Sequence, residues 1–205
     1  MPGSIIGKSL LIAGLALGAT AAMAQDKPAT MTGASDSMLA NTCAGCHGTN
    51  GASAGPASPT IAGLSEEYLV EVMEGFAADE VPATIMGRIA KGYTEAEIKQ
   101  LAKFYAAQPF VKAKGQKFDA AMVDKGAKLH DKYCEKCHAE GGTSAEDDAG
   151  VLAGQWQPWV RWTMEDYLAG DREPTKKMKK KITQLTEDHG DEGWEALYSY
   201  YASQQ

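Results

Sequence analysis

Apolar residues recur at helical spacing along much of the chain, and the clear period-two alternation of half-buried strands is absent. The first helical segment follows Ser65, a residue type that caps helices, and it carries Glu66 and Glu67 where carboxylates favour the helix dipole. Its apolar positions are Tyr68, Leu69, Val72, Met73 and Phe76. The pattern predicts a helix that begins directly after Ser65.

Three further helices follow from the same reading. Thr94 and Glu97 form a capping box, and Pro109 ends the helix that it starts. Pro158 suits the first turn of another helix, and Gly193 precedes a last one. The apolar residues of these helices are Ile98, Leu101, Ala102 and Tyr105, then Trp159, Trp162, Tyr167 and Leu168, then Trp194, Leu197, Tyr198 and Tyr201. The sequence therefore predicts an all-α fold.

The chain contains two copies of one unit. The pattern Cys-x-x-Cys-His occurs at residues 43–47 and again, 91 positions later, at 134–138. Other matches keep the same order at offsets that grow from 91 to 96, namely 61–63 with 152–154, Tyr68 with Trp159, 73–74 with 164–165, Met86 with Met178, and 104–108 with 200–204. We expect an N-terminal domain at 25–107, a linker at 108–117 and a C-terminal domain at 118–205.

Residues 1–24 have the pattern of a signal peptide. Lys8 precedes a short run of small and apolar residues, which ends at an Ala-x-Ala cleavage pattern, Ala22-Met23-Ala24. The alternative is a retained anchor, but the run is shorter than the roughly 20 apolar residues that a span needs. We expect cleavage after Ala24 and a periplasmic mature protein without a membrane span.

Composition narrows the class of protein. The 205 residues carry a formal net charge of −7, which argues against a nucleic-acid binder that works by bulk positive charge. A hydrophobic content of 44% argues against wholesale disorder. Four cysteines are too few for a disulfide-dense scaffold of this size.

The placement of the cysteines carries the chemistry. Cys-x-x-Cys-His is the attachment pattern of a c-type haem, in which two thiols bond to the porphyrin and the adjacent histidine reaches the iron. The pattern predicts two covalent haem c groups, one on Cys43, Cys46 and His47 and the other on Cys134, Cys137 and His138. A four-ligand zinc site, a thioredoxin-like dithiol and two ordinary disulfides are the alternatives, and none of them requires both histidines.

A second axial ligand decides between electron transfer and catalysis, because an open iron position binds substrates. Two methionine pairs survive in the repeat, Met73 with Met164 and Met86 with Met178. Met73 lies on an apolar helical stripe, so we assign that pair to the core. Met86 and Met178 lie 39 and 40 positions after the motif histidines, and we expect them to be the axial ligands.

Met178 lies within a basic run. Its neighbours are Lys176, Lys177, Lys179, Lys180 and Lys181, whose stems could cover the edge of a pocket while their charges stay solvated. An exposed Met178 on a solvated basic face is the alternative. A docking surface for a redox partner is the functional hypothesis for this lysine cluster. The other histidines, His130 and His189, are expected to be a packed or hydrogen-bonded residue and a helix-end residue.

The mature chain resembles the dihaem cytochrome c subunit of flavocytochrome c sulfide dehydrogenase. The resemblance extends beyond the haem motifs and is carried by CAGCHGTNG, GPASPTIAG, VEVMEGF, TIMGRIAKGY, GAKLHDKYCEKCHAEGG, LAGQW and YASQQ. It implies two tandem class I cytochrome c-like domains, each around one covalent haem c. It implies thioether bonds at Cys43, Cys46, Cys134 and Cys137, and axial ligation by His47, Met86, His138 and Met178.

The resemblance also implies a partner. An FAD-containing subunit would oxidise sulfide and form a heterodimer with this chain, so that electrons pass from the flavin through both haems to an external acceptor. The cytochrome itself would carry out no bond-making chemistry on the substrate. A free dihaem carrier of the cytochrome c4 type is the main competitor, and a dihaem peroxidase is a third. The sequence leaves open which haem faces the flavin, the order of the potentials and the identity of the acceptor.

Overall fold

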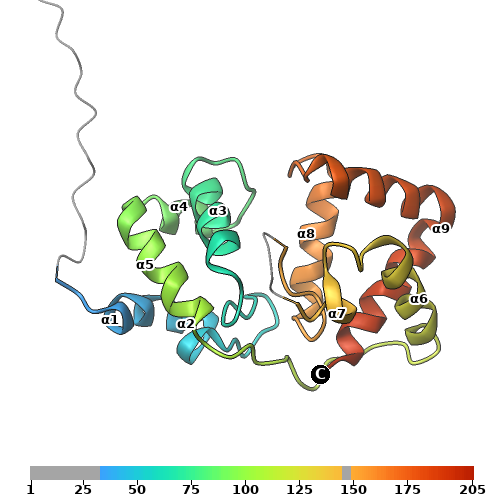
Figure 1. Ribbon diagram of the computed structural model, residues 1–205, viewed down its shortest axis with the longest axis horizontal. Coiled ribbons are helices and arrows are strands. Elements are labelled where there is room, and N and C mark those ends of the chain that lie inside the picture. Colours follow the sequence, from blue (N-terminus) through green and yellow to red (C-terminus); the bar gives the residue numbers. More distant parts are fainter. Residues whose placement is uncertain (1–32, 145–148) are drawn as a thin grey trace, which may run out of the picture.

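The computed structural model describes residues 33–144 and 149–205, so the predicted signal segment lies outside the described residues. All regular elements in these two ranges are helices, as the pattern predicted. Figure 1 shows two groups of helices side by side, joined along one edge by an extended connection. No helix in the described part of the chain combines the length and apolar character needed to cross a bilayer.

The two groups correspond to the two sequence copies. The first comprises α1 (Asp36–Ala40), η1 (Asn41–Cys43), α2 (Ala44–His47), η2 (Thr49–Gly51), α3 (Glu66–Ala77), α4 (Met86–Ala90) and α5 (Glu95–Ala106). The second comprises α6 (Val123–Tyr133), α7 (Ala139–Gly142), α8 (Gln157–Ala169) and α9 (Lys176–Ser203).

Local sequence signals fix most helix starts. The Ser65 hydroxyl accepts from the Tyr68 amide at 3.1 Å, and the Thr94–Glu97 capping box is complete in both directions. Pro158 lies in the first turn of α8. These three predictions are confirmed.

The start predicted after Gly193 is wrong. Helix α9 begins at Lys176, where Thr175 caps it through the Met178 amide, and its helical geometry is interrupted at Gly190. Lysine is a good helix former, so the basic run extends the helix once the cap starts it. Gly193 lies inside the helix, buried, where a Cβ would approach the His189 side chain to 2.6 Å.

Each half has its own apolar core. In the first half, α1 and α3 pack against α5, while in the second half α6 crosses α9. That crossing is close, because a Cβ on Gly126 would stand 2.0 Å from the carbonyl oxygen of Ala196. Only glycine permits the backbone of α6 to lie so near α9.

Matched hydrogen bonds confirm the duplication. The carbonyl of Gly51 accepts from the amides of residues 61 and 62, and the carbonyl of Gly142 accepts from those of 152 and 153. Likewise the Gly63 amide donates to the Tyr105 carbonyl at 2.9 Å, and the Gly154 amide donates to the Tyr201 carbonyl at 3.0 Å. The second copy therefore repeats the backbone of the first.

The halves interlock rather than merely touch. Val151 belongs to the second copy by sequence, yet it is buried in the core of the first half. The ring of Trp156 lies directly against Gly55, whose φ of +59° and lack of a Cβ both suit the contact. The connection is held as well, since Gln116 and Gln205 exchange two hydrogen bonds of 3.0 Å.

Candidate haem sites

The two Cys-x-x-Cys-His motifs occupy equivalent turns. Cys43 ends η1, and Cys46 and His47 lie in α2. In the second half, Cys134 directly follows α6, while Cys137 and His138 precede α7. In each pair the first cysteine is partly buried and the second is exposed, and none of the four forms a disulfide. Within the described ranges, no three His, Cys, Asp or Glu side chains gather closely enough to hold a metal ion.

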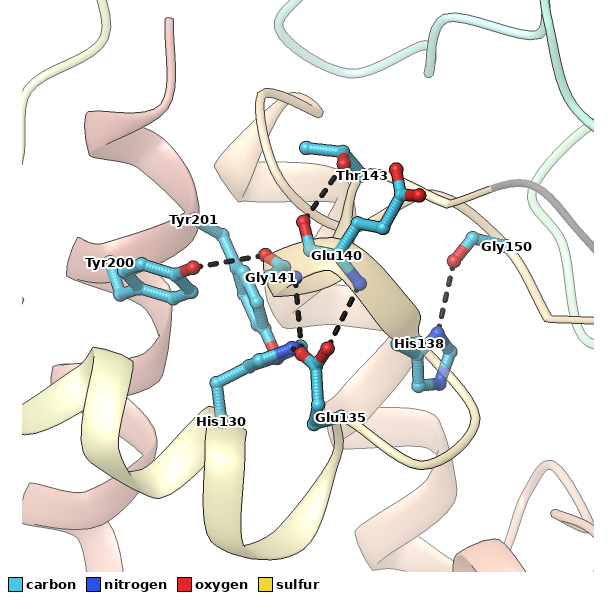
Figure 2. A network of polar contacts seen from close by, with 9 residues as sticks. All are labelled: His130, Glu135, His138, Glu140, Gly141, Thr143, Gly150, Tyr200 and Tyr201. Atoms are coloured by element: carbon cyan, nitrogen blue, oxygen red, sulfur yellow. Dashed lines mark hydrogen bonds and ion pairs between the residues drawn. The ribbon is translucent and has the colours of Figure 1, made fainter.

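Both motif histidines make the same second contact. The Nδ1 of His47 lies 2.9 Å from the carbonyl oxygen of Pro59, and the Nδ1 of His138 lies 3.0 Å from that of Gly150, each 12 residues further on. Because a carbonyl only accepts, Nδ1 carries the proton, and Nε2 keeps its lone pair. Figure 2 shows this bond for His138. This arrangement orients an imidazole that coordinates a metal through Nε2.

Burial favours the neutral form of both histidines. Desolvation lowers the pKa of His47, and the bond to Pro59 opposes that shift only in part. Desolvation also lowers the pKa of His138, against the bond to Gly150 and with a smaller contribution from the nearby His130. A metal ligand must be unprotonated, so both sites suit coordination at neutral pH.

The methionines expected to ligate the iron occupy corresponding positions. Met86 is the first residue of α4, and Met178 lies in the first turn of α9. Both are partly buried, and Met178 packs against the second core in spite of its lysine neighbours. Met164, assigned to the core, packs against the same cluster. Axial ligation by Met86 and Met178 stays a prediction.

The donor set and its surroundings fit a covalent haem. Each half offers two cysteines outside any disulfide, one oriented imidazole and one partly buried thioether. Beside Met86, the side chains of Ile85 and Ile89 are 47% and 36% exposed, as expected of a face that a large apolar group covers.

The second site has a polar support that the first site lacks (Figure 2). His130 is 2% exposed, its Nδ1 lies 2.9 Å from the Tyr201 hydroxyl, and its Nε2 lies 2.8 Å from a carboxylate oxygen of Glu135. Glu135 also accepts from the amides of Glu140 and Gly141 at 3.0 Å each. The prediction that His130 is packed and hydrogen-bonded is confirmed. Its partner Glu135 was missed, because it occupies a variable position between the two cysteines.

The carboxylate of Glu135 holds a strained turn. Glu140 has a φ of +54°, a left-handed conformation that is unfavourable for a residue with a Cβ. The hydrogen bond from the Gly141 amide lowers the pKa of Glu135. Burial opposes this shift, and the hydrogen bond to His130 adds to it, so the ionised form of Glu135 is the one that holds the turn. The turn directly follows His138 and so lies beside the second candidate iron ligand.

Comparisons with known proteins agree with this geometry. A family model described as cytochrome c matches residues 34–106. The cytochrome subunit of sulfide dehydrogenase from Chlorobaculum tepidum is 36% identical over 96 residues, which cover 47% of this chain and 86% of that protein. Cytochrome c4 from Azotobacter vinelandii is 30% identical over 147 residues, covering 63% and 69% of the two chains.

A solved structure shares the fold of both halves. The reduced cytochrome c4 from Pseudomonas stutzeri superposes with a TM-score of 0.67 at 22% identity, over 82% of this chain and 95% of that one. At this identity the likeness shows the architecture alone. It agrees with the two helical groups and the repeated hydrogen bonds described above.

Proposed function

This chain belongs to the cytochrome c family and carries two covalent haem c groups, and on that premise we propose that it is the electron-transfer subunit of a sulfide-oxidising flavocytochrome. In this role it accepts electrons from an FAD-containing subunit in the periplasm and delivers them to an external acceptor. The chemistry on sulfide belongs to the flavoprotein. Cys43, Cys46, Cys134 and Cys137 hold the haems, and His47, Met86, His138 and Met178 ligate the irons.

The observation that carries an electron-transfer role is the duplication of a complete ligand set. Each half supplies an oriented histidine and a partly buried methionine in corresponding places. When bound by such a pair, a haem supplies a reversible one-electron centre with no position open to substrate. This argues for electron transfer at both sites and against a peroxidase.

The protein's own residues act by fixing geometry. Pro59 and Gly150 hold the imidazoles through their carbonyls, and the Glu135 network stabilises the turn after His138. Because these groups are already in place, a change in iron charge requires little movement of the chain. Small rearrangement on gain and loss of an electron is what a carrier needs.

The sulfide-oxidising partner is supported by the relative from Chlorobaculum tepidum, which is named a cytochrome subunit of sulfide dehydrogenase. The segments that carry the resemblance stated above also lie in both halves. The lysine cluster, residues 176–181 apart from Met178, lies on the first turns of α9 around that methionine, and all of its members except the partly buried Lys181 are exposed. We assign it to docking of a negatively charged redox partner.

A free dihaem carrier is the second candidate. Cytochrome c4 relatives match about two thirds of this chain, and the solved cytochrome c4 matches both halves. Such a carrier would have the same haem sites and no flavoprotein partner.

Affinity capture of the native protein from its periplasm, at low salt, separates the two candidates. A flavoprotein that copurifies near one-to-one, with acid-extractable or covalent flavin, and reduction of both haems by sulfide in that complex are the results expected. Haem without flavin under these gentle conditions would contradict the sulfide-oxidising role and favour the free carrier.

A further inference from the structure

A hydrogen-bond relay crosses from the second half of the molecule to the candidate iron ligand of the first half. The peptide bond between Pro59 and Thr60 has both of its polar groups in use. Its carbonyl accepts from the Nδ1 of His47 at 2.9 Å. Its amide, which belongs to Thr60, donates to Oε1 of Gln155 at 2.9 Å. The relay thus runs from Gln155 through one peptide group to His47.

Gln155 is built into this position. Its side chain is 1% exposed, and Thr60 is fully buried. Its Nε2 donates to the Thr60 carbonyl at 2.8 Å, and its Oε1 also accepts from the amide of Trp156 at 3.0 Å. A side-chain amide held by three hydrogen bonds in a buried interface has one orientation, so the relay is fixed.

Hydrogen bonds in such a chain reinforce one another. When Gln155 accepts from the amide, the peptide group is polarised, and its carbonyl becomes a better acceptor. A better acceptor draws the Nδ1 proton of His47 and makes the imidazole a more basic ligand. A more basic ligand stabilises oxidised iron over reduced iron, and so lowers the reduction potential.

The second site lacks this relay among the contacts that the structure defines. The Gly150 carbonyl accepts from His138 at 3.0 Å, and the phenol of Tyr68, its hydroxyl included, packs against Gly150 from the other half. Among the hydrogen bonds that the structure defines, none joins Tyr68 to the peptide that follows Gly150, so this contact does not reproduce the relay. The two irons therefore receive different support from the neighbouring half.

We infer that Gln155, a residue of the C-terminal half, is a positioning residue that tunes the haem of the N-terminal half through the Pro59–Thr60 peptide and His47. The inference rests on the ligand assignment of His47 under the proposed function. It is independent of the identity of the redox partner, so it applies equally to a free carrier.

The test replaces Gln155 in the full-length protein carrying both haems and follows each potential. Gln155→Met keeps the length and neutrality of the side chain but cannot form the relay. We expect the equilibrium constant for reduction of the N-terminal haem to rise on the order of tenfold, the lower end of outer-shell effects. For a one-electron couple, tenfold corresponds to about 59 mV. The C-terminal haem should keep its potential.

Two sets of variants make the result specific. Met86→His and Met178→His assign the potentials, because each exchanges the methionine of one site for a ligand that gives a lower potential. Thr60→Val is the matched control, since it removes the Thr60 hydroxyl, which lies 3.4 Å from the Val111 carbonyl, but leaves the relay intact. A residue that only joins the halves would alter stability and leave both potentials in place. No shift in Gln155→Met, or a shift confined to the C-terminal haem, would overturn the inference.

A measurement on the unchanged protein covers the case in which Gln155→Met does not fold. In the reduced state, the ring Nδ1 proton of His47 should exchange with solvent more slowly than that of His138. Equal exchange rates would contradict the relay. His47→Ala tests the ligand assignment itself. If the N-terminal haem of this variant keeps its low-spin histidine coordination, His47 is not an iron ligand, and the proposed site fails rather than the relay alone.

Discussion

Both halves have a tyrosine at the corresponding position, but its hydroxyl has a different hydrogen-bond partner in each half. The hydroxyl of Tyr105 donates to the carbonyl of Ala40 at 2.6 Å, whereas the hydroxyl of its counterpart Tyr201 lies 2.9 Å from the Nδ1 of His130. The first-half counterpart of His130 is Leu39, and both are almost completely buried.

The fold requires a buried side chain at this position, but that side chain can be apolar or polar. An apolar leucine fills the position in the first half, and in the second half an imidazole does so because Tyr201 and Glu135 occupy both of its nitrogens. The counterpart of Glu135 is Ala44, so the polar residues changed as a group. A buried polar group is accepted here only as a complete network.

Removal of one pair of cysteines should have the largest effect on the comparison. Cys43→Ser with Cys46→Ser, and separately Cys134→Ser with Cys137→Ser, should each remove one covalent haem and leave the other. Intact-protein mass and pyridine haemochrome absorbance measure the haem content. A double variant that still carries two covalent haems would show that the motif is not the attachment site.

His130→Leu gives the second half the apolar residue that the first half has at this position. We expect it to lower the free energy of unfolding by about 1–3 kcal/mol, because the buried Tyr201 hydroxyl and the Glu135 carboxylate each lose the imidazole as a partner. Adding Tyr201→Phe should recover part of the loss, since the buried hydroxyl left by His130→Leu is then gone. Urea unfolding measures all three proteins. If the two losses simply add, the residues do not act as a network.

Neutralising the lysine cluster tests whether the halves differ in docking. Changing Lys176, Lys177 and Lys180 to glutamine should slow electron exchange with an anionic partner on the order of tenfold at low salt, and flatten its salt dependence. Lys99→Gln with Lys103→Gln, on an exposed part of α5, is the matched control in the first half. Stopped-flow rates at several ionic strengths give the answer, and equal effects from both sets would remove the docking role.

The smallest expected effect depends on pH. The pKa of Glu135 is lowered from its ordinary 4.5, so its ionised form stabilises the fold above that pH, and the contribution is lost as the pH falls through the lowered value. Glu135→Gln should therefore be less stable than the unchanged protein near pH 6, and the difference should shrink below pH 4.5. Urea midpoints at several pH values measure it. Glu80→Gln, exposed in the first half, controls for loss of charge.

Local signals in the sequence were sufficient for much of the fold. The caps at Ser65 and Thr94 act within one helical turn, so spacing alone predicts them. The duplication was visible because both copies keep the residues that make the same backbone contacts. The break at Gly190 agrees with the prediction that His189 lies at a helix end, whereas the helical stretch that starts at Lys176 was missed, because a run of lysines carries no apolar periodicity.

Long-range contacts could not be predicted from the sequence. Gln155 meets Thr60 across 95 positions, and nothing in either segment marks the pairing. Glu135 is likewise inconspicuous, because the motif accepts most residue types between its cysteines. The haem ligands could be proposed from spacing, whereas the groups that orient them, the carbonyls of Pro59 and Gly150 among them, became visible only in the folded structure.

The burial of Val151 in the first core bears on how the protein is made. Val151 follows the second Cys-x-x-Cys-His motif along the chain, yet the first core is incomplete without it. During synthesis, the first core therefore lacks one of its buried apolar side chains until the second attachment motif has emerged. The final packing of the first half is thus completed only after the second Cys-x-x-Cys-His motif has been made.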